Sequence, residues 1–124
     1  MPMPKTIRLM IVDDNVHTRR AMAAYVSGLD GVKLVAEAFD GQDALEKLDA
    51  SAPDVVLMDC RMPRLTGLEA TRILKRRCPR TKVVALTLYP ECSLEVRQAG
   101  ADMVLMKGCA AVELDSAIRT MADR

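Results

Sequence analysis

The stretch Leu9-Met10-Ile11-Val12-Asp13-Asp14 joins a short apolar run to two adjacent carboxylates, and this pattern decides the fold. It recurs with a single polar residue at three further places, where residues 55–58 lead into Asp59, 83–86 into Thr87 and 103–106 into Lys107. Continuous apolar runs of this length are typical of parallel strands that are covered on both faces. The carboxyl ends of neighbouring parallel strands lie at one edge of their sheet. We therefore expect three carboxylates, a hydroxyl and an ammonium to share one cleft.

Breakers and helical spacing divide the rest of the chain into alternating elements. Strands are predicted at residues 7–12, 32–38, 54–58, 82–87 and 102–106. Helices are predicted over residues 15–27, from Asp40 onward, from Thr66 onward, over 90–98 and over about 110–122. Three signals mark helix ends: Gly28 after the first helix, a Thr66–Glu69 capping box before the third, and Pro90 in the first turn of the fourth.

This alternation of strands and helices predicts the fold class. A parallel return needs a crossover, usually a helix, so the pattern indicates an α/β domain with a five-stranded parallel sheet. A doubly wound (βα)5 chain of the flavodoxin-like type most often has the strand order 2-1-3-4-5. Its first and third strands are adjacent, and ligands bind at the switch point between them. We expect residues 1–124 to form this single domain, ordered over about 6–122.

The composition argues against several classes of function. A net charge of +1 gives no electrostatic reason to expect nucleic-acid or membrane binding, and no apolar stretch approaches the roughly 18 residues of a membrane span. Phe39, Tyr25 and Tyr89 are too few aromatic residues for a base-stacking surface. The four cysteines have no Cys-x-x-Cys spacing, and His17 cannot complete a zinc site with them. Scattered thiols and the lack of an apolar secretory segment predict a cytoplasmic protein.

The carboxylates at the predicted sheet edge indicate metal and phosphoryl chemistry. Adjacent strands lie about 4.8 Å apart, so Asp13, Asp14 and Asp59 would crowd one another and raise the pKa of at least one carboxyl group. A divalent cation relieves this conflict, and few protein oxygens with room for water suit Mg²⁺. Asp59 would then attack phosphorus, while Lys107 supplies a positive charge and Thr87 donates a hydrogen bond to a phosphoryl oxygen. Alone, each residue has an ordinary role in a turn, cap, strand or surface, so the functional interpretation rests on their joint position.

The chain resembles, over essentially its whole length, the receiver domains of two-component response regulators, whose fold is CheY-like. The segments that carry the resemblance are Leu9-Met10-Ile11-Val12-Asp13-Asp14-Asn15, Val56-Leu57-Met58-Asp59-Cys60-Arg61-Met62-Pro63, Thr66-Gly67-Leu68-Glu69-Ala70, Thr87, and Gly100-Ala101-Asp102 leading to Lys107. The resemblance implies that Asp59 accepts a phosphoryl group from the phosphohistidine of a sensor histidine kinase, without enzymatic turnover. It also implies Mg²⁺ held by Asp14, Asp59 and the backbone carbonyl of Arg61, with Asp13 acting through water.

The residue after Lys107 indicates the type of regulator. Gly108 stands there, as in regulators of the nitrate-response and quorum-sensing type, which usually carry a helix-turn-helix domain after the receiver. The chain stops at Arg124, where a receiver would end, so it is either a stand-alone receiver or an excised domain. DNA binding and control of transcription would then come only from an output domain that this chain lacks. On phosphorylation we expect a homodimer, through the fourth helix, fifth strand and fifth helix, or through the first and fifth helices.

Two positions depart from the family pattern. Leu88 stands where a small residue usually follows Thr87, and Val104 replaces the usual Tyr or Phe that swings inward on activation. These departures keep open a second function, a receiver-like interaction module that dimerises without phosphate, although no acidic or lysine position is lost. An aspartyl-phosphate phosphatase would need a second Asp two residues after Asp59, where this chain has Arg61. A flavin-binding domain would need a phosphate loop rich in Ser, Thr or Gly after the first strand.

Overall fold

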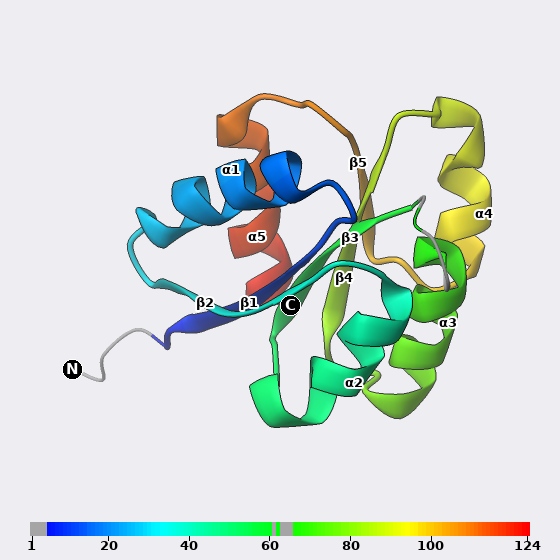
Figure 1. The fold of residues 1–124 in the computed structure, drawn as a ribbon, viewed down its shortest axis with the longest axis horizontal. Coiled ribbons are helices and arrows are strands. Elements are labelled where there is room, and N and C mark those ends of the chain that lie inside the picture. The colour runs from blue at the N-terminus through cyan, green and yellow to red at the C-terminus, as the bar shows by residue number, and fades with distance from the viewer. Residues whose placement is uncertain (1–4, 61, 63–65) are drawn as a thin grey trace.

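In residues 5–60, 62 and 66–124, which the computed structural model describes, five parallel strands form one sheet with helices on both faces (Figure 1). The strands are β1 (Ile7–Val12), β2 (Val32–Ala38), β3 (Val55–Asp59), β4 (Lys82–Thr87) and β5 (Met103–Met106). The helices are α1 (Val16–Ser27), α2 (Gly41–Ser51), α3 (Gly67–Arg77), α4 (Ser93–Gln98) and α5 (Ala111–Ala122), and a 3₁₀ turn, η1 (Pro90–Cys92), precedes α4. The order β2-β1-β3-β4-β5 confirms the predicted fold class.

Each face of the sheet carries its own hydrophobic core. On one face, Met10 and Val56 pack with apolar residues of α2, α3 and α4. On the other, Leu9 and Leu57 pack with apolar residues of α1 and α5. Figure 1 shows the same division of the helices between the two faces. Because successive strand residues serve opposite cores, the strands have to be continuously apolar. None of the helices in the described part of the chain is both long and apolar enough to cross a membrane.

Side-chain caps begin the helices where the sequence places small polar residues. Asn15 and Asp40 each accept a hydrogen bond from the backbone N–H three residues later, at 3.0 and 2.8 Å. Thr66 Oγ1 accepts one from the Glu69 N–H at 3.2 Å, which confirms the predicted start of α3. The second hydrogen bond differs from that of a standard capping box. The Glu69 carboxylate accepts a hydrogen bond from the Thr66 hydroxyl at 3.0 Å, and not from the Thr66 backbone N–H.

Several element boundaries differ from the prediction by one residue: α1 begins at Val16, β3 at Val55 and β5 at Met103. Two differences matter more for the site. Asp59 is the last residue of β3, still paired in the sheet, and not the first residue after it. Residues 90–98 are not one helix, because only Ser93–Gln98 is α-helical and the preceding turn is 3₁₀. Pro90 does occupy the first turn, but no side chain caps that turn. A backbone hydrogen bond from the Cys92 N–H to the Tyr89 carbonyl, three residues back, gives the turn its 3₁₀ geometry instead.

Candidate functional site

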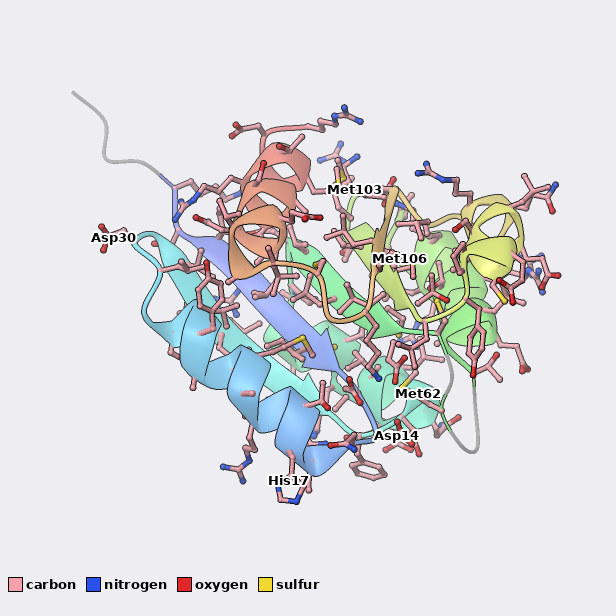
Figure 2. The ribbon with its side chains drawn as sticks, turned by 90° about the horizontal axis from the view of Figure 1, so that it is seen from above. Asp14, His17, Asp30, Met62, Met103 and Met106 are labelled. Carbon is pink, nitrogen blue, oxygen red and sulfur yellow. The ribbon has the colours of Figure 1, made fainter. Side chains whose placement is uncertain are left out.

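The carboxyl ends of β1, β3, β4 and β5 share one edge of the sheet, and the polar residues at these ends gather there. Asp13 follows β1, Asp59 ends β3, Thr87 ends β4 and Lys107 follows β5. One carboxylate oxygen from each of Asp13, Asp14 and Asp59 lies within 4.8 Å of the other two. Figure 2 shows Asp14 beyond the end of β1, beside the start of α1. The structure thus brings together the five residues that sequence reasoning selected at positions 13, 14, 59, 87 and 107.

Lys107 connects two of the carboxylates across this edge. Its Nζ donates a hydrogen bond to Asp59 Oδ2 at 3.0 Å and lies 3.2 Å from Asp13 Oδ2. The two carboxylates are 6% and 0% exposed, so salt and solvent screen these ion pairs weakly. Burial alone lowers the pKa of Lys107, but the hydrogen bond to Asp59 and the charges of Asp59 and Asp13 outweigh burial and raise it. The ammonium is therefore charged at neutral pH.

Asp13 is fully buried and has one oxygen without a hydrogen bond. Its Oδ1 accepts the backbone N–H of Asn15 at 2.8 Å. Its Oδ2 has no hydrogen-bond partner in the described residues, since Lys107 Nζ approaches it as an ion pair outside hydrogen-bond geometry. Buried polar atoms are normally satisfied by protein, water or an ion. The convergence of three carboxylate oxygens, with Asp14 open to solvent and, among the described residues, only one ammonium beside them, fits a hydrated divalent cation that prefers oxygen ligands.

The Thr87 hydroxyl is bonded to the turn that follows β4. It accepts the backbone N–H of Tyr89 at 3.0 Å and donates to the Tyr89 carbonyl at 3.2 Å. It also lies within hydrogen-bonding reach of the thiol of Cys60, the residue after Asp59. Burial, with the nearby Asp59 and Cys92, raises the pKa of that thiol to about 11, so Cys60 is protonated at neutral pH. Thr87 therefore ties the end of β4 to the turn that leads to α4.

Gly67 is a further residue of the site that sequence reasoning did not single out. It is the first residue of α3, and its N–H donates to the Cys60 carbonyl at 3.2 Å. A Cβ added there would lie 2.0 Å from the carbonyl oxygen of Asp59, so only glycine lets α3 begin against the end of β3. The signal in the sequence is a glycine directly after an N-cap residue, at a position where better helix formers are available.

The remaining predicted positions lie at or beyond the rim of this cluster. Arg61, the predicted carbonyl ligand, lies outside the described residues. Leu88 is 59% exposed and follows Thr87 directly, and Val104 is half-buried against the core of the α4 face. His17 projects from α1 away from the sheet in Figure 2 and is not part of the cluster.

Comparisons with known sequences agree with this geometry. A model of the family described as response regulator receiver domain matches residues 9–119. The response regulator GacA of Pseudomonas viridiflava is 42% identical over 115 residues, which cover 91% of this chain and 54% of the relative. The response regulator UvrY of Escherichia coli K12 is 41% identical over 117 residues, 93% of this chain and 54% of the relative. The chain therefore spans about half the length of these curated relatives.

Solved structures show the same arrangement of elements. The signal receiver domain of the putative response regulator NarL from Mycobacterium tuberculosis superposes with a TM-score of 0.90, at 30% identity, over 97% of this chain and 98% of that one. The response regulator domain of Thermotoga maritima CheB superposes with a TM-score of 0.88, at 27% identity, over 97% and 98%. With the acidic cluster at the carboxyl edge of a 2-1-3-4-5 sheet, these matches show that the chain belongs to the receiver-domain family of two-component response regulators.

Proposed function

We propose that Asp59 of this receiver domain accepts a phosphoryl group from the phosphohistidine of a sensor histidine kinase. The observation that carries the proposal is the buried contact between Asp59 and the Lys107 ammonium, at 3.0 Å, within the cluster formed with Asp13 and Asp14. A carboxylate can attack phosphorus, and the surrounding charges can stabilise the transferring group. Receiver domains are signalling domains and not classical turnover enzymes, and we propose that this chain likewise holds one phosphoryl group and loses it slowly.

In the proposed transfer, one carboxylate oxygen of Asp59 attacks the phosphorus. A P–O bond forms while the P–N bond of the phosphohistidine breaks, and the imidazole nitrogen keeps the electron pair of that bond. Asp59 needs no general base, because an ionised carboxylate is already nucleophilic. Lys107 remains charged, since its pKa is raised, and pairs with a phosphoryl oxygen once Asp59 carries the group.

Asp14 and Asp59 are the proposed side-chain ligands of Mg²⁺, with Asp13 acting through water and the backbone carbonyl of Arg61 completing the set. When bound, the cation supplies positive charge that neutralises the transferring phosphoryl oxygens. The support for this assignment is the donor set itself. Three carboxylates converge, one oxygen of Asp13 lacks a hydrogen bond, and Asp14 is open to solvent.

Thr87 is the proposed connection between phosphorylation and the output surface. To donate a hydrogen bond to a phosphoryl oxygen, its hydroxyl must give up the Tyr89 carbonyl, which it now contacts at 3.2 Å. That exchange would loosen or shift the turn before α4. The side chain of Val104 is smaller than the aromatic residue usual in the family, so its movement would displace fewer neighbouring atoms. We therefore expect only a modest structural change at the face formed by α4, β5 and α5.

The wider role proposed for the domain follows from its likeness to regulators of the nitrate-response and quorum-sensing type. Through an output domain outside this chain, the phosphorylated receiver would control transcription in the cytoplasm. The second candidate function, an interaction module that works without phosphate, is supported only by Leu88 and Val104. The full set of charged groups at the sheet edge favours phosphorylation instead.

Labelling with acetyl phosphate and Mg²⁺, followed by intact mass, tests the proposal. We expect the wild type to gain one phosphoryl group and Asp59→Asn to gain none. Asp30→Asn is the matched control, because Asp30 is an exposed aspartate in the turn after α1, at the opposite end of this helix from Asp14 (Figure 2). This variant should label as the wild type does. Phosphate on Asp59→Asn would refute the assignment, and an unlabelled wild type would favour the interaction module.

A further inference from the structure

Arg19, near the start of α1, reaches back to the turn that carries Asp13 and Asp14. Its Nη1 donates to the backbone carbonyl of Asp13 at 2.9 Å, and its Nε donates to Glu37 Oε1 of β2 at 3.3 Å. The arginine side chain is only 14% exposed. A guanidinium presents its donors in a rigid planar fork, so two partners on separate elements hold Arg19 in one orientation.

The carbonyl that Arg19 holds belongs to the peptide unit joining Asp13 to Asp14. That unit is planar, so the direction of the carbonyl sets the direction in which the Asp14 backbone continues. Two more hydrogen bonds hold Asp13 itself: its N–H donates to the Ala38 carbonyl at 3.0 Å, and its Oδ1 accepts the Asn15 N–H at 2.8 Å. Arg19 supplies the contact on the side of the turn that leads to Asp14.

Asp14 has no anchor of its own. In the described part of the chain its exposed carboxylate makes no hydrogen bond or ion pair, although one of its oxygens belongs to the carboxylate cluster. The position of this carboxylate therefore depends on the backbone, and so on the peptide unit that Arg19 holds. Glu37 has a fixed backbone from which to meet Arg19, because it is paired with Ile11 in the sheet and its carbonyl accepts Lys47 Nζ at 2.7 Å.

We propose that Arg19, oriented by Glu37, is a positioning residue for divalent-cation binding, acting through the Asp13–Asp14 peptide unit. The inference rests on the proposed function, because it needs a cation site at Asp14. Charge alone predicts the opposite effect: Arg19 is itself a cation near the carboxylate cluster, so removing it should tighten cation binding. Loss of positioning instead weakens binding, so the sign of the change separates the two explanations.

Mg²⁺ titration without any phosphodonor, followed by calorimetry or amide NMR shifts, measures that sign. We expect Arg19→Ala to weaken Mg²⁺ binding roughly tenfold, the low end of the range for partners that orient metal ligands. Arg19→Lys should recover part of the affinity, because an ammonium can reach one of the two acceptors. Arg20→Ala is the matched control. Arg20 is the next residue of α1 and is exposed, so the substitution removes the same charge without affecting the turn. The Mg²⁺ affinity of this variant should equal that of the wild type.

A double variant tests the route through Asp14. Because Arg19 acts through this ligand, Asp14→Ala and Asp14→Ala/Arg19→Ala should bind Mg²⁺ equally weakly. Urea unfolding of each variant reports stability separately, and a purely structural role would lower stability without moving the Mg²⁺ affinity. At saturating Mg²⁺, Arg19→Ala should regain nearly the wild-type rate of acetyl phosphate labelling.

Unchanged or tighter Mg²⁺ binding in Arg19→Ala would overturn the positioning role. If that variant fails to fold, Arg19→Lys takes its place, because it keeps the positive charge but cannot contact both acceptors. Charge alone then predicts unchanged Mg²⁺ binding, whereas the positioning role predicts binding weaker than in the wild type. A wild type that binds no Mg²⁺ would refute the proposed metal site and this inference with it. Normal binding by the wild type with no effect of either substitution would refute the positioning role alone.

Discussion

Replacing Gly67 with alanine tests whether α3 must begin against the backbone of the strand that carries Asp59. The added Cβ would lie 2.0 Å from the Asp59 carbonyl oxygen, 2.8 Å from Cys60 Cα and 2.9 Å from the Asp59 carbonyl carbon. Comfortable contacts between heavy atoms are about 3.5 Å, so the two segments must separate by about 1 Å or more. All three atoms belong to the backbone, so no side-chain rotation can relieve the clash.

The size of the effect follows from these contacts. Overpacking of this kind costs about 1–3 kcal/mol, and separation also weakens the Gly67–Cys60 backbone hydrogen bond, worth about 1 kcal/mol. The higher helix propensity of alanine offsets up to about 1 kcal/mol. We therefore expect the free energy of unfolding to fall by about 1–3 kcal/mol, which lowers the urea midpoint by about 0.5–1.5 M for a slope of about 2 kcal/mol/M.

The same displacement should reach the chemistry. A shift of about 1 Å at the end of β3 would break the 3.0 Å contact of Asp59 with Lys107, and misplacement of that size can slow a reaction roughly a hundredfold. Urea unfolding and acetyl phosphate labelling measure the two effects. Gly28→Ala is the control, because Gly28 has a φ of −89° and an added Cβ would meet only Tyr25 O, at 3.6 Å. Wild-type stability and labelling in Gly67→Ala would refute the close-approach argument.

Three further predictions concern access, output and pH. Leu88, 59% exposed beside Thr87, should restrict the approach of water and small phosphodonors to Asp59, so Leu88→Ala should label and lose phosphate faster; unchanged rates would leave Leu88 without a role in access. Beryllofluoride with Mg²⁺ should shift the protein modestly toward a homodimer, through α4, β5 and α5 or through α1 and α5, and an unchanged monomer in sedimentation would contradict this. The pKa of Cys60 is raised from 9.0 to about 11, so the folded state holds this proton more tightly than the unfolded chain. Its contribution to stability is therefore complete below about pH 9 and lost as the pH rises toward 11; Cys60→Ser should flatten that decline, and equal slopes would argue against the shift.

The sequence by itself determined the architecture and the place of the site. Apolar runs and helix caps are local patterns, and a parallel sheet puts the carboxyl ends of all its strands at one edge. Asp13, Asp59 and Lys107 could therefore be assigned to a common site before any distance was known. The boundaries at Asp59 and in residues 90–98 were less accurate, because the ends of elements depend on individual hydrogen bonds that spacing does not record.

Only the tertiary structure decided how the side chains at this edge are paired. It placed Lys107 between two carboxylates, bonded the Thr87 hydroxyl to the following turn, and set Arg19 on the carbonyl of Asp13. It also showed that Gly67 must lack a side chain. These contacts join residues of separate elements, such as Asp59 and Lys107, which are 48 positions apart in the sequence. Whether they form depends on differences of about 1 Å in how the strands and helices are placed. Hydrophobic periodicity specifies which face of an element is buried, but it contains no information at that scale.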